Sequence, residues 1–281
     1  MSLANPAAGA LEQRLVNSHF HSSASYWTEV YRNETVEAAI YRQRHEVVLS
    51  IVAELGLPQG SRILELGCGA GLTSVALAQR GYQVEAVDSV PIMVDLTSRH
   101  AKQAGVDDRV VSSVGDAHRL EFADEQFALV LAIGLTPWLH SLETALREMA
   151  RVVRTGGHVI VTADNRHRLA YWLDPRQNPL HAPFRPYVAA ILRKAQLLRD
   201  SPKPRVRMYA VREFDGYIQA VGLQKQCGVV LGFGPFTLFS RRLLPNSLGV
   251  RLHQALQQRA AGIPLLRWAG SQYVVLARKQ F

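Results

Sequence analysis

The sequence predicts an α/β protein in which a doubly wound, mostly parallel sheet of seven strands is flanked by helices. Short apolar strands alternate with helical segments from about residue 61 to residue 163, which is typical of such sheets. A glycine-rich turn, GCGAG at 67–71, joins the first strand to the first helix of this series. The segment FALVLAI at 127–133 is apolar on both faces, as a central parallel strand should be.

Each element follows from its hydrophobic period. Residues 11–55 are expected to be largely helical, because apolar residues recur at helical spacing between 47 and 55. Strands are expected at 63–66, 84–87, 109–114, 127–133, 158–163, 225–231 and 272–277. Helices are expected at 72–79, 92–102, 142–153, 187–198 and 212–220. Thr155, Gly156 and Gly157 follow the third of these helices and are expected to end it.

The same pattern predicts a single domain over residues 1–281 with four parts. Residues 1–57 are expected to form a helical lid, and residues 58–163 the core that binds a ligand. Two insertions, 164–207 and 232–270, leave the sheet near the carboxyl ends of its strands, where α/β sheets bind ligands. We therefore expect these insertions to form a substrate cap.

Composition fits an ordinary globular chain, with 48% hydrophobic and 20% charged residues. No apolar run approaches the ~18 residues that a membrane span requires. The first twenty residues also lack the basic start and apolar centre of a secretory signal. The two cysteines, Cys68 and Cys227, are too few for a disulfide framework or a zinc cluster. We therefore expect a cytoplasmic protein with no membrane partner.

The net charge of +9 permits a nucleic acid, an anionic membrane surface or an acidic substrate as partner. The basic residues are dispersed, however, with only short clusters at 166–168 and 205–207. No aromatic-basic motif of the RNA-binding kind is present. Nucleic acid is therefore the disfavoured partner, and a basic but unspecialised surface is the simpler account.

Three glycines within five positions indicate a backbone that approaches a ligand closely. The dinucleotide fingerprint G-x-G-x-x-G is not met, because position 72 is leucine, and no Walker A lysine follows. Asp88 ends the second strand about 20 residues later, where an acid can accept bonds from two ribose hydroxyls. Glu65 adds a carboxylate that suits a cationic ligand better than a pyrophosphate.

The run ELGCGAG at 65–71, followed by Asp88 and by GDAHRL at 115–120, resembles the class I S-adenosylmethionine-dependent methyltransferases. The resemblance covers at least residues 61–163. It implies a Rossmann-like fold with an antiparallel last strand. It also implies S-adenosyl-L-methionine as cofactor and S-adenosyl-L-homocysteine as product. No recurring metal-ligand spacing is visible, so no metal is expected.

The resemblance also assigns residues to the cofactor. It places the three glycines and Glu65 beside the methionine part, Asp88 at the ribose, and Asp116 at the adenine amino group. The complete set of residues expected to bind the cofactor is Glu65, Gly67, Cys68, Gly69, Gly71, Asp88, Ser89, Asp116, Ala117, Ala132, Ile133, Tyr31 and Arg44.

For the acceptor side we expect His140 as the general base and Trp138, Asn165 and His167 as substrate-binding residues, because all four follow strand ends. Packing or loop polarity explains them equally well. The family's (D/N)-P-P-(Y/F) motif for amide-type nitrogen acceptors is absent after the fourth strand, which favours an oxygen, carbon or simple amine acceptor on a small molecule. Of these we expect oxygen. The segment at 164–179 resembles bacterial stand-alone methyltransferases of secondary-metabolite or glycan pathways, and its arginines suit a carrier-bound or anionic acceptor.

Three other functions stay open. The charge leaves room for an RNA methyltransferase, and the fold leaves room for a non-catalytic subunit that binds the cofactor beside a catalytic companion. A nucleotide-dependent oxidoreductase is the third. A monomer or a homodimer is expected.

Overall fold

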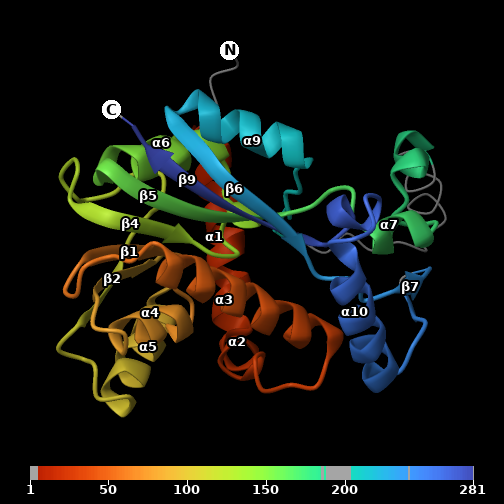
Figure 1. Ribbon diagram of the computed structural model, residues 1–281, viewed down its shortest axis with the longest axis horizontal. Coiled ribbons are helices and arrows are strands. Elements are labelled where there is room, and N and C mark those ends of the chain that lie inside the picture. The colour runs from red at the N-terminus through yellow and green to blue at the C-terminus, as the bar shows by residue number, and fades with distance from the viewer. Residues whose placement is uncertain (1–5, 185–186, 188–203, 240, 281) are drawn as a thin grey trace.

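A computed structural model describes residues 6–184, 187, 204–239 and 241–280, and its centre is a seven-stranded sheet in the order β3-β2-β1-β4-β5-β9-β6 (Figure 1). β3, β2, β1, β4 and β5 pair in parallel, and β9 runs antiparallel to both β5 and β6. The strands are β1 (Arg62–Leu66), β2 (Gln83–Asp88), β3 (Val110–Val114), β4 (Phe127–Ala132), β5 (Val153–Asp164), β6 (Leu223–Leu231) and β9 (Gln272–Lys279). The predicted doubly wound sheet with an antiparallel last strand is confirmed.

Helices cover both faces of this sheet (Figure 1). α6 (Leu142–Val152) and α9 (Val211–Ala220) lie on one face, where Leu146, Met149 and Phe214 are fully buried. α3 (Val36–Glu54), α4 (Leu72–Ala78) and α5 (Pro91–Gln103) lie on the other. β4 is buried at every position, as expected of a strand between two helical layers.

The two insertions start at the same end of the sheet. The last residues of β5 and β6, Asp164 and Leu231, both pair with Gln272 at the start of β9. The first contains α7 (Leu169–Leu173) and the short helix η2 (Pro179–Phe184). The second contains the paired strands β7 (Thr237–Leu238) and β8 (Arg241–Arg242), then α10 (Asn246–Ala260) and η3 (Leu266–Trp268). α7, β7 and α10 therefore stand together beside the sheet (Figure 1).

The chain starts with two helices, α1 (Pro6–Ser22) and α2 (Ala24–Glu29), and α1 is fixed to segments far away in the sequence. The Asn17 amide donates to the backbone oxygen of Ser89, and the Ser89 hydroxyl donates to Oδ1 of Asn17 (3.1 and 2.9 Å). On its other side, Arg207 holds both carboxylate oxygens of Glu12 (2.6 and 2.9 Å). These contacts place α1 across the edge where β1, β2 and β4 end.

The structure differs from the sequence prediction in a few elements. β5 begins directly after α6, so Gly156 and Gly157 lie inside the strand rather than at a helix stop. The register between β4 and β5 shifts at this point, and a Cβ on Gly157 would stand 3.0 Å from the carbonyl oxygen of Ala128. β7 and β8 were not predicted. The helix predicted at 187–198 lies, except for Tyr187, outside the described residues.

Candidate functional site

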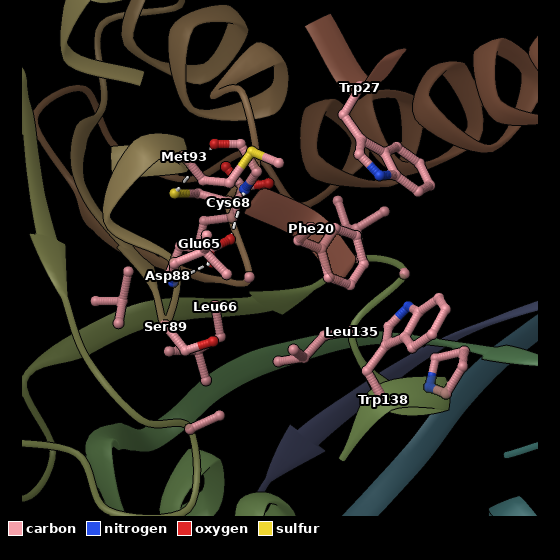
Figure 2. Close-up of a pocket in the computed structure, with 18 of the residues that line it drawn as sticks. Phe20, Trp27, Glu65, Leu66, Cys68, Asp88, Ser89, Met93, Leu135 and Trp138 are labelled. Atoms are coloured by element: carbon pink, nitrogen blue, oxygen red, sulfur yellow. Dashed lines mark hydrogen bonds between the residues drawn. The ribbon is translucent and has the colours of Figure 1, made fainter. Parts of the chain in front are cut away.

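A central cavity opens at the carboxyl ends of β1, β2 and β4, with α1 and α2 across from them (Figure 2). The strand ends and their loops form its inner wall. Aromatic side chains from α1, α2, α3 and the short helix η1 (Thr136–Trp138) form the opposite wall, which we call the outer wall. This is the edge at which a parallel sheet of this kind binds ligands.

The glycine turn brings backbone to the inner wall. The backbone N–H of Gly67 donates to the carbonyl of Val87 (2.7 Å), which ties the end of β1 to the end of β2. Gly69 has φ +55° and open space where a Cβ would be. Gly71 has φ +79°, and a Cβ there would stand 2.7 Å from the side chain of Thr97. Gly71 therefore serves close packing of α5, and Gly69 leaves room for a ligand.

Asp88 is connected to this turn. Its Oδ2 accepts from the backbone N–H of Gly69 (3.0 Å), and its Oδ1 accepts from that of Val90 (2.9 Å). Burial raises the pKa of Asp88 above its ordinary value, although these backbone donors oppose the rise. Each oxygen keeps a further lone pair, so the carboxylate can still accept from a ligand.

Glu65 lies deeper, at the end of β1, and is 3% exposed. Its Oε2 accepts from the hydroxyl of Ser74 in α4. Burial raises the pKa of Glu65 to about 7, and hydrogen bonds from Ser74 and Thr73 oppose this. A positive charge bound beside Glu65 would stabilise its ionised form.

Asp116 follows β3 and is held by a histidine two residues later. The backbone N–H and the Nδ1 of His118 lie 2.9 and 2.7 Å from Oδ1 of Asp116. The backbone N–H of Ser141 points at Nε2 of His118 (3.3 Å), so Nε2 is the acceptor and Nδ1 carries the proton. The hydrogen bond from His118 lowers the pKa of Asp116, and Oδ2 stays free to accept from a ligand.

The central cavity also holds one buried cation, the guanidinium of Arg44 in α3, which is 6% exposed. Arg44 donates to Oε1 of Gln272 (3.0 Å), and Gln272 donates to Asp164 at the end of β5 (2.8 Å). The guanidinium also lies beside Gly134, where a Cβ would approach it to 3.1 Å. Nε of Arg44 is buried without a hydrogen-bond partner among the described residues, so it is a donor available to an anionic group.

The outer wall is aromatic. Phe20 packs edge-on against Trp138 at 5.1 Å between ring centroids and lies 5.5 Å from Trp27 (Figure 2). Tyr31 and Tyr41 continue this wall. A flat or apolar molecule can be held against such rings.

Most of the sequence-predicted site residues meet in the central cavity. Those that line it are Tyr31, Arg44, Glu65, Gly67, Cys68, Gly69, Asp88, Ser89, Asp116, Ala117, Ile133 and Trp138. Gly71 and Ala132 lie behind the wall, in the turn and in buried β4. Burial raises the pKa of the Cys68 thiol, which packs against Thr97. The thiol therefore stays neutral.

Three predicted acceptor residues lie away from the central cavity. The amide of Asn165 donates to the carbonyls of Trp268 and Gly270 (both 2.8 Å), so it joins the two insertions. His167 is exposed next to it. His140 stacks on His118 at 3.6 Å and lines a neighbouring groove. Their predicted roles in binding or catalysis stay predictions.

Several residues of the cavity were missed from the sequence: Gln13, Phe20, Tyr41, His118 and Gln272. The spacing Asp116-Ala117-His118 offered a usable signal, because a side chain two residues after an aspartate can reach its carboxylate. The α1 residues gave no local signal, since contacts with residues distant in the sequence, among them Ser89, Trp138 and Arg207, hold α1 at the cavity.

Comparison with known proteins agrees with this geometry. Residues 64–161 match the family described as the methyltransferase domain. A ubiquinone biosynthesis O-methyltransferase from Azorhizobium caulinodans is 37% identical over 108 residues, which are 38% of this chain and 42% of that protein. Another from Aeromonas salmonicida is 30% identical over 112 residues, 40% of this chain and 47% of that protein. The chain thus matches less than half the length of these relatives.

Solved structures share the fold over most of the chain. Geranyl diphosphate C-methyltransferase from Streptomyces coelicolor A3(2) superposes with a TM-score of 0.55 and 20% identity, covering 88% of this chain and 82% of that one. The cyclase SpnF superposes with a TM-score of 0.54 and 20% identity, covering 83% and 80%. A cyclase and a methyltransferase therefore share this fold, so the fold alone does not identify the reaction.

The segment matched in sequence coincides with the inner wall of the cavity. Residues 64–161 include the glycine turn, Asp88 and Asp116, which form the inner wall of the central cavity. Residues 64–161 of this chain therefore match the methyltransferase domain, and the sheet that carries them has the fold of the solved methyltransferase structure.

Proposed function

We propose that this chain transfers the methyl group of S-adenosyl-L-methionine to an oxygen atom of a small-molecule acceptor and releases S-adenosyl-L-homocysteine. One observation carries the proposal: a wall of carboxylates and glycine backbone faces a wall of aromatic rings across the same cavity. The first wall suits a cationic nucleoside, and the second suits an apolar or aromatic acceptor. The O-methyltransferases among the relatives support oxygen as the reacting atom.

The residues present fit the cofactor. Glu65, Asp88 and Asp116 supply three carboxylates to the cavity, which favours a ligand that carries positive charge. The space beside Gly69 is open, so a ligand can approach the backbone there. The unpartnered Nε of Arg44 adds a donor for a carboxylate. A ligand with a sulfonium, an ammonium and a carboxylate matches this set.

Each part of the cofactor then has its residues. Asp88 accepts from the ribose hydroxyls, and Ser89 lies beside it. Asp116 accepts from the adenine amino group through its free Oδ2, and Ala117 adds its backbone N–H. Glu65 faces the ammonium of the methionine part, and Arg44 faces its carboxylate. Tyr31 and Ile133 line the same end of the cavity.

When bound, the cofactor supplies an electrophilic methyl group on a positively charged sulfur. The chain has to align an acceptor with it and exclude water, and alignment is the larger contribution. Phe20, Trp27 and Trp138 perform this by holding the acceptor against the aromatic wall. His140 remains our candidate general base, although it lines the neighbouring groove, because it stacks on His118 of the cavity wall. Burial and His118 lower its pKa and leave a neutral imidazole that can take a proton.

Two measurements test the proposal. Calorimetry should show that S-adenosyl-L-homocysteine binds and that NAD does not, and binding of NAD alone would instead support an oxidoreductase. Labelled S-adenosyl-L-methionine should then be incubated with the protein and an extract of the cells that make it. Label in the organic-soluble pool supports a small-molecule acceptor, whereas label in RNA supports an RNA methyltransferase. Cofactor binding without any transfer would favour a non-catalytic subunit.

The proposal also includes a lid function for the N-terminal helices and a substrate-cap function for the two insertions. It further includes a reaction without a metal and a monomeric or homodimeric protein. None of the helices in the described part of the chain could span a membrane by length and hydropathy.

A further inference from the structure

A second hollow, which we call the basic groove, lies next to the central cavity. Its polar lining consists of Arg166, Arg205, Arg207, His140, Tyr209 and the first turn of α6. Two short segments separate the cavity from the groove. Trp138 and Leu139 line the cavity while His140 and Ser141 line the groove, and Val206 lines both. The backbone N–H of Arg207 donates to the carbonyl of Pro137 (2.8 Å), which fixes the two segments together.

The charges in the basic groove do not cancel. Arg207 is paired with Glu12 by two hydrogen bonds, and Arg166 lies 3.2 Å from Glu213. Glu143 also lines the groove, and its carboxylate is already paired with Arg147 one turn later on the same face of α6. Arg205 is exposed and has no hydrogen-bond or ion-pair partner among the described residues. The groove therefore holds one guanidinium without a direct ion pair beside two paired ones, and Arg205 helps to lower the pKa of Glu12.

The first turn of α6 strengthens this surplus of positive potential. Ser141 caps the helix by accepting from the N–H of Thr144 (3.3 Å). The N–H groups of Leu142 and Glu143 precede any intrahelical acceptor, so they are directed out of the helix start. Helix N-termini and arginine forks both favour oxyanions. Here they meet in one groove.

We infer that the basic groove binds an oxyanion, a phosphate or carboxylate group, carried by the acceptor whose reacting end lies in the central cavity. This inference rests on the proposed function for its assignment to the acceptor. It specifies the substrate class: an apolar or aromatic reacting end joined to an anionic group. Arg205 is the main contact, with the start of α6 beside it. Glu12 competes with the bound oxyanion, because its carboxylate already accepts two hydrogen bonds from the Arg207 guanidinium.

The test uses the full chain and three probes at fixed ionic strength: inorganic pyrophosphate, citrate and a short single-stranded RNA. Calorimetry measures the affinity of each for the wild type and for Arg205→Glu. Arg251→Glu is the matched control, because Arg251 is an exposed arginine of α10 outside the groove. Pyrophosphate or citrate should bind the wild type, and Arg205→Glu should lose about tenfold or more in affinity. Arg251→Glu should change the affinity by less than about twofold.

A second variant should increase the affinity for the anion rather than decrease it. Glu12→Gln frees Arg207, so it should tighten pyrophosphate binding, whereas a merely structural Glu12 would leave the affinity unchanged or weaken it. Tighter binding of pyrophosphate than of citrate identifies a phosphorylated acceptor, and the reverse identifies a carboxylate. Absence of anion binding, or equal losses in Arg205→Glu and Arg251→Glu, would overturn the inference. So would RNA that binds the groove more tightly than either small anion.

Titration of S-adenosyl-L-homocysteine separates this inference from the proposed function. Arg205→Glu and Arg251→Glu should bind it as the wild type does, because neither substituted residue lines the central cavity. Failure of the wild type to bind it would contradict the proposed function alone. Failure of the anion signal to depend on Arg205 would contradict the groove alone.

Discussion

The two walls of the central cavity are built in different ways. The inner wall comes from strand ends and the turns that follow them, and it consists of glycine backbone and the carboxylates of Glu65, Asp88 and Asp116. The outer wall comes from helices α1 and α2 and from η1, and its groups are side chains that meet across long stretches of sequence. Asp88 reaches Gly69 over 19 positions, whereas Arg207 reaches Glu12 over 195.

This difference separates two functions. A wall fixed by backbone and sheet register keeps one shape, which suits a ligand that every member of a family shares. A wall made of side chains on peripheral helices can change residue by residue, which suits an acceptor that differs between members. We therefore expect substitutions in the inner wall to affect cofactor binding and those in the outer wall to affect the acceptor.

The largest effect is expected from Gly71→Val. Its Cβ would stand 2.7 Å from the side chain of Thr97 and 2.9 Å from the Thr97 Cα, at a φ of +79°. Strain and overpacking should together lower the free energy of unfolding by about 3 kcal/mol or more and abolish binding of S-adenosyl-L-homocysteine. Urea denaturation and calorimetry measure the two effects.

Gly105→Val is the control for Gly71→Val, since Gly105 has φ +66° but open space around its Cβ position. It should show the backbone penalty alone and keep normal cofactor affinity. Equal losses in both variants would mean that the packing of the turn against α5 does not matter.

Asp88→Asn comes next. The substitution removes the charge that holds the Gly69 N–H and that, in our proposal, accepts from the ribose, so the affinity for S-adenosyl-L-homocysteine should fall by about 10- to 100-fold. Asp95→Asn, an exposed acid of α5, is the matched control and should have no effect. An unchanged affinity in Asp88→Asn would remove Asp88 from the site.

Glu65 should give the inner wall a pH dependence. Burial raises its pKa to about 7 in the folded protein, against about 4.3 in an unfolded chain. Because the folded pKa is the higher one, the stabilisation is fully present below about pH 4.3 and is lost as the pH rises towards 7. The loss corresponds to roughly 4 kcal/mol and should be absent in Glu65→Gln. Denaturation at a series of pH values measures it.

Ligand binding has the opposite dependence on pH. An ammonium beside Glu65 favours the ionised carboxylate, so affinity for S-adenosyl-L-homocysteine should rise between about pH 6 and 8 in the wild type. The rise should disappear in Glu65→Gln. Adenosine lacks the ammonium and should bind both proteins without this rise. A rise with adenosine as well would assign the titration to another group.

The same contrast explains what could be read from the sequence. Every strand of the main sheet was predicted, because strands and helices of this fold have local periods. The start of β5 was misplaced, because Gly156 and Gly157 look like a helix stop while the structure places them at a register shift against Ala128. β7 and β8, with two residues each, are too short to show a period.

The residues of the candidate site fall into the same two groups, those that the sequence predicts and those that depend on long-range contacts. The glycine turn, Asp88 and Asp116 lie at the ends of consecutive strands, so their convergence follows from the predicted parallel sheet. Phe20 belongs to a helix whose position depends on contacts with Ser89 and Arg207, and no local pattern encodes that position. Asn165 follows a strand end like Asp88 does, yet its amide holds the carbonyls of Trp268 and Gly270. Only the three-dimensional contacts distinguish these two cases.

The smallest expected effect tests the outer wall. Trp138→Ala removes the ring that Phe20 contacts, so methyl transfer into the organic-soluble pool should fall by about tenfold. Affinity for S-adenosyl-L-homocysteine should change by less than about twofold, because the inner wall is intact. Trp268→Ala is the control, since Trp268 is 52% exposed in η3 and lies outside the cavity. If Trp138→Ala weakened cofactor binding as much as transfer, the two walls would not be separable, and the division between a shared cofactor and a variable acceptor would fail.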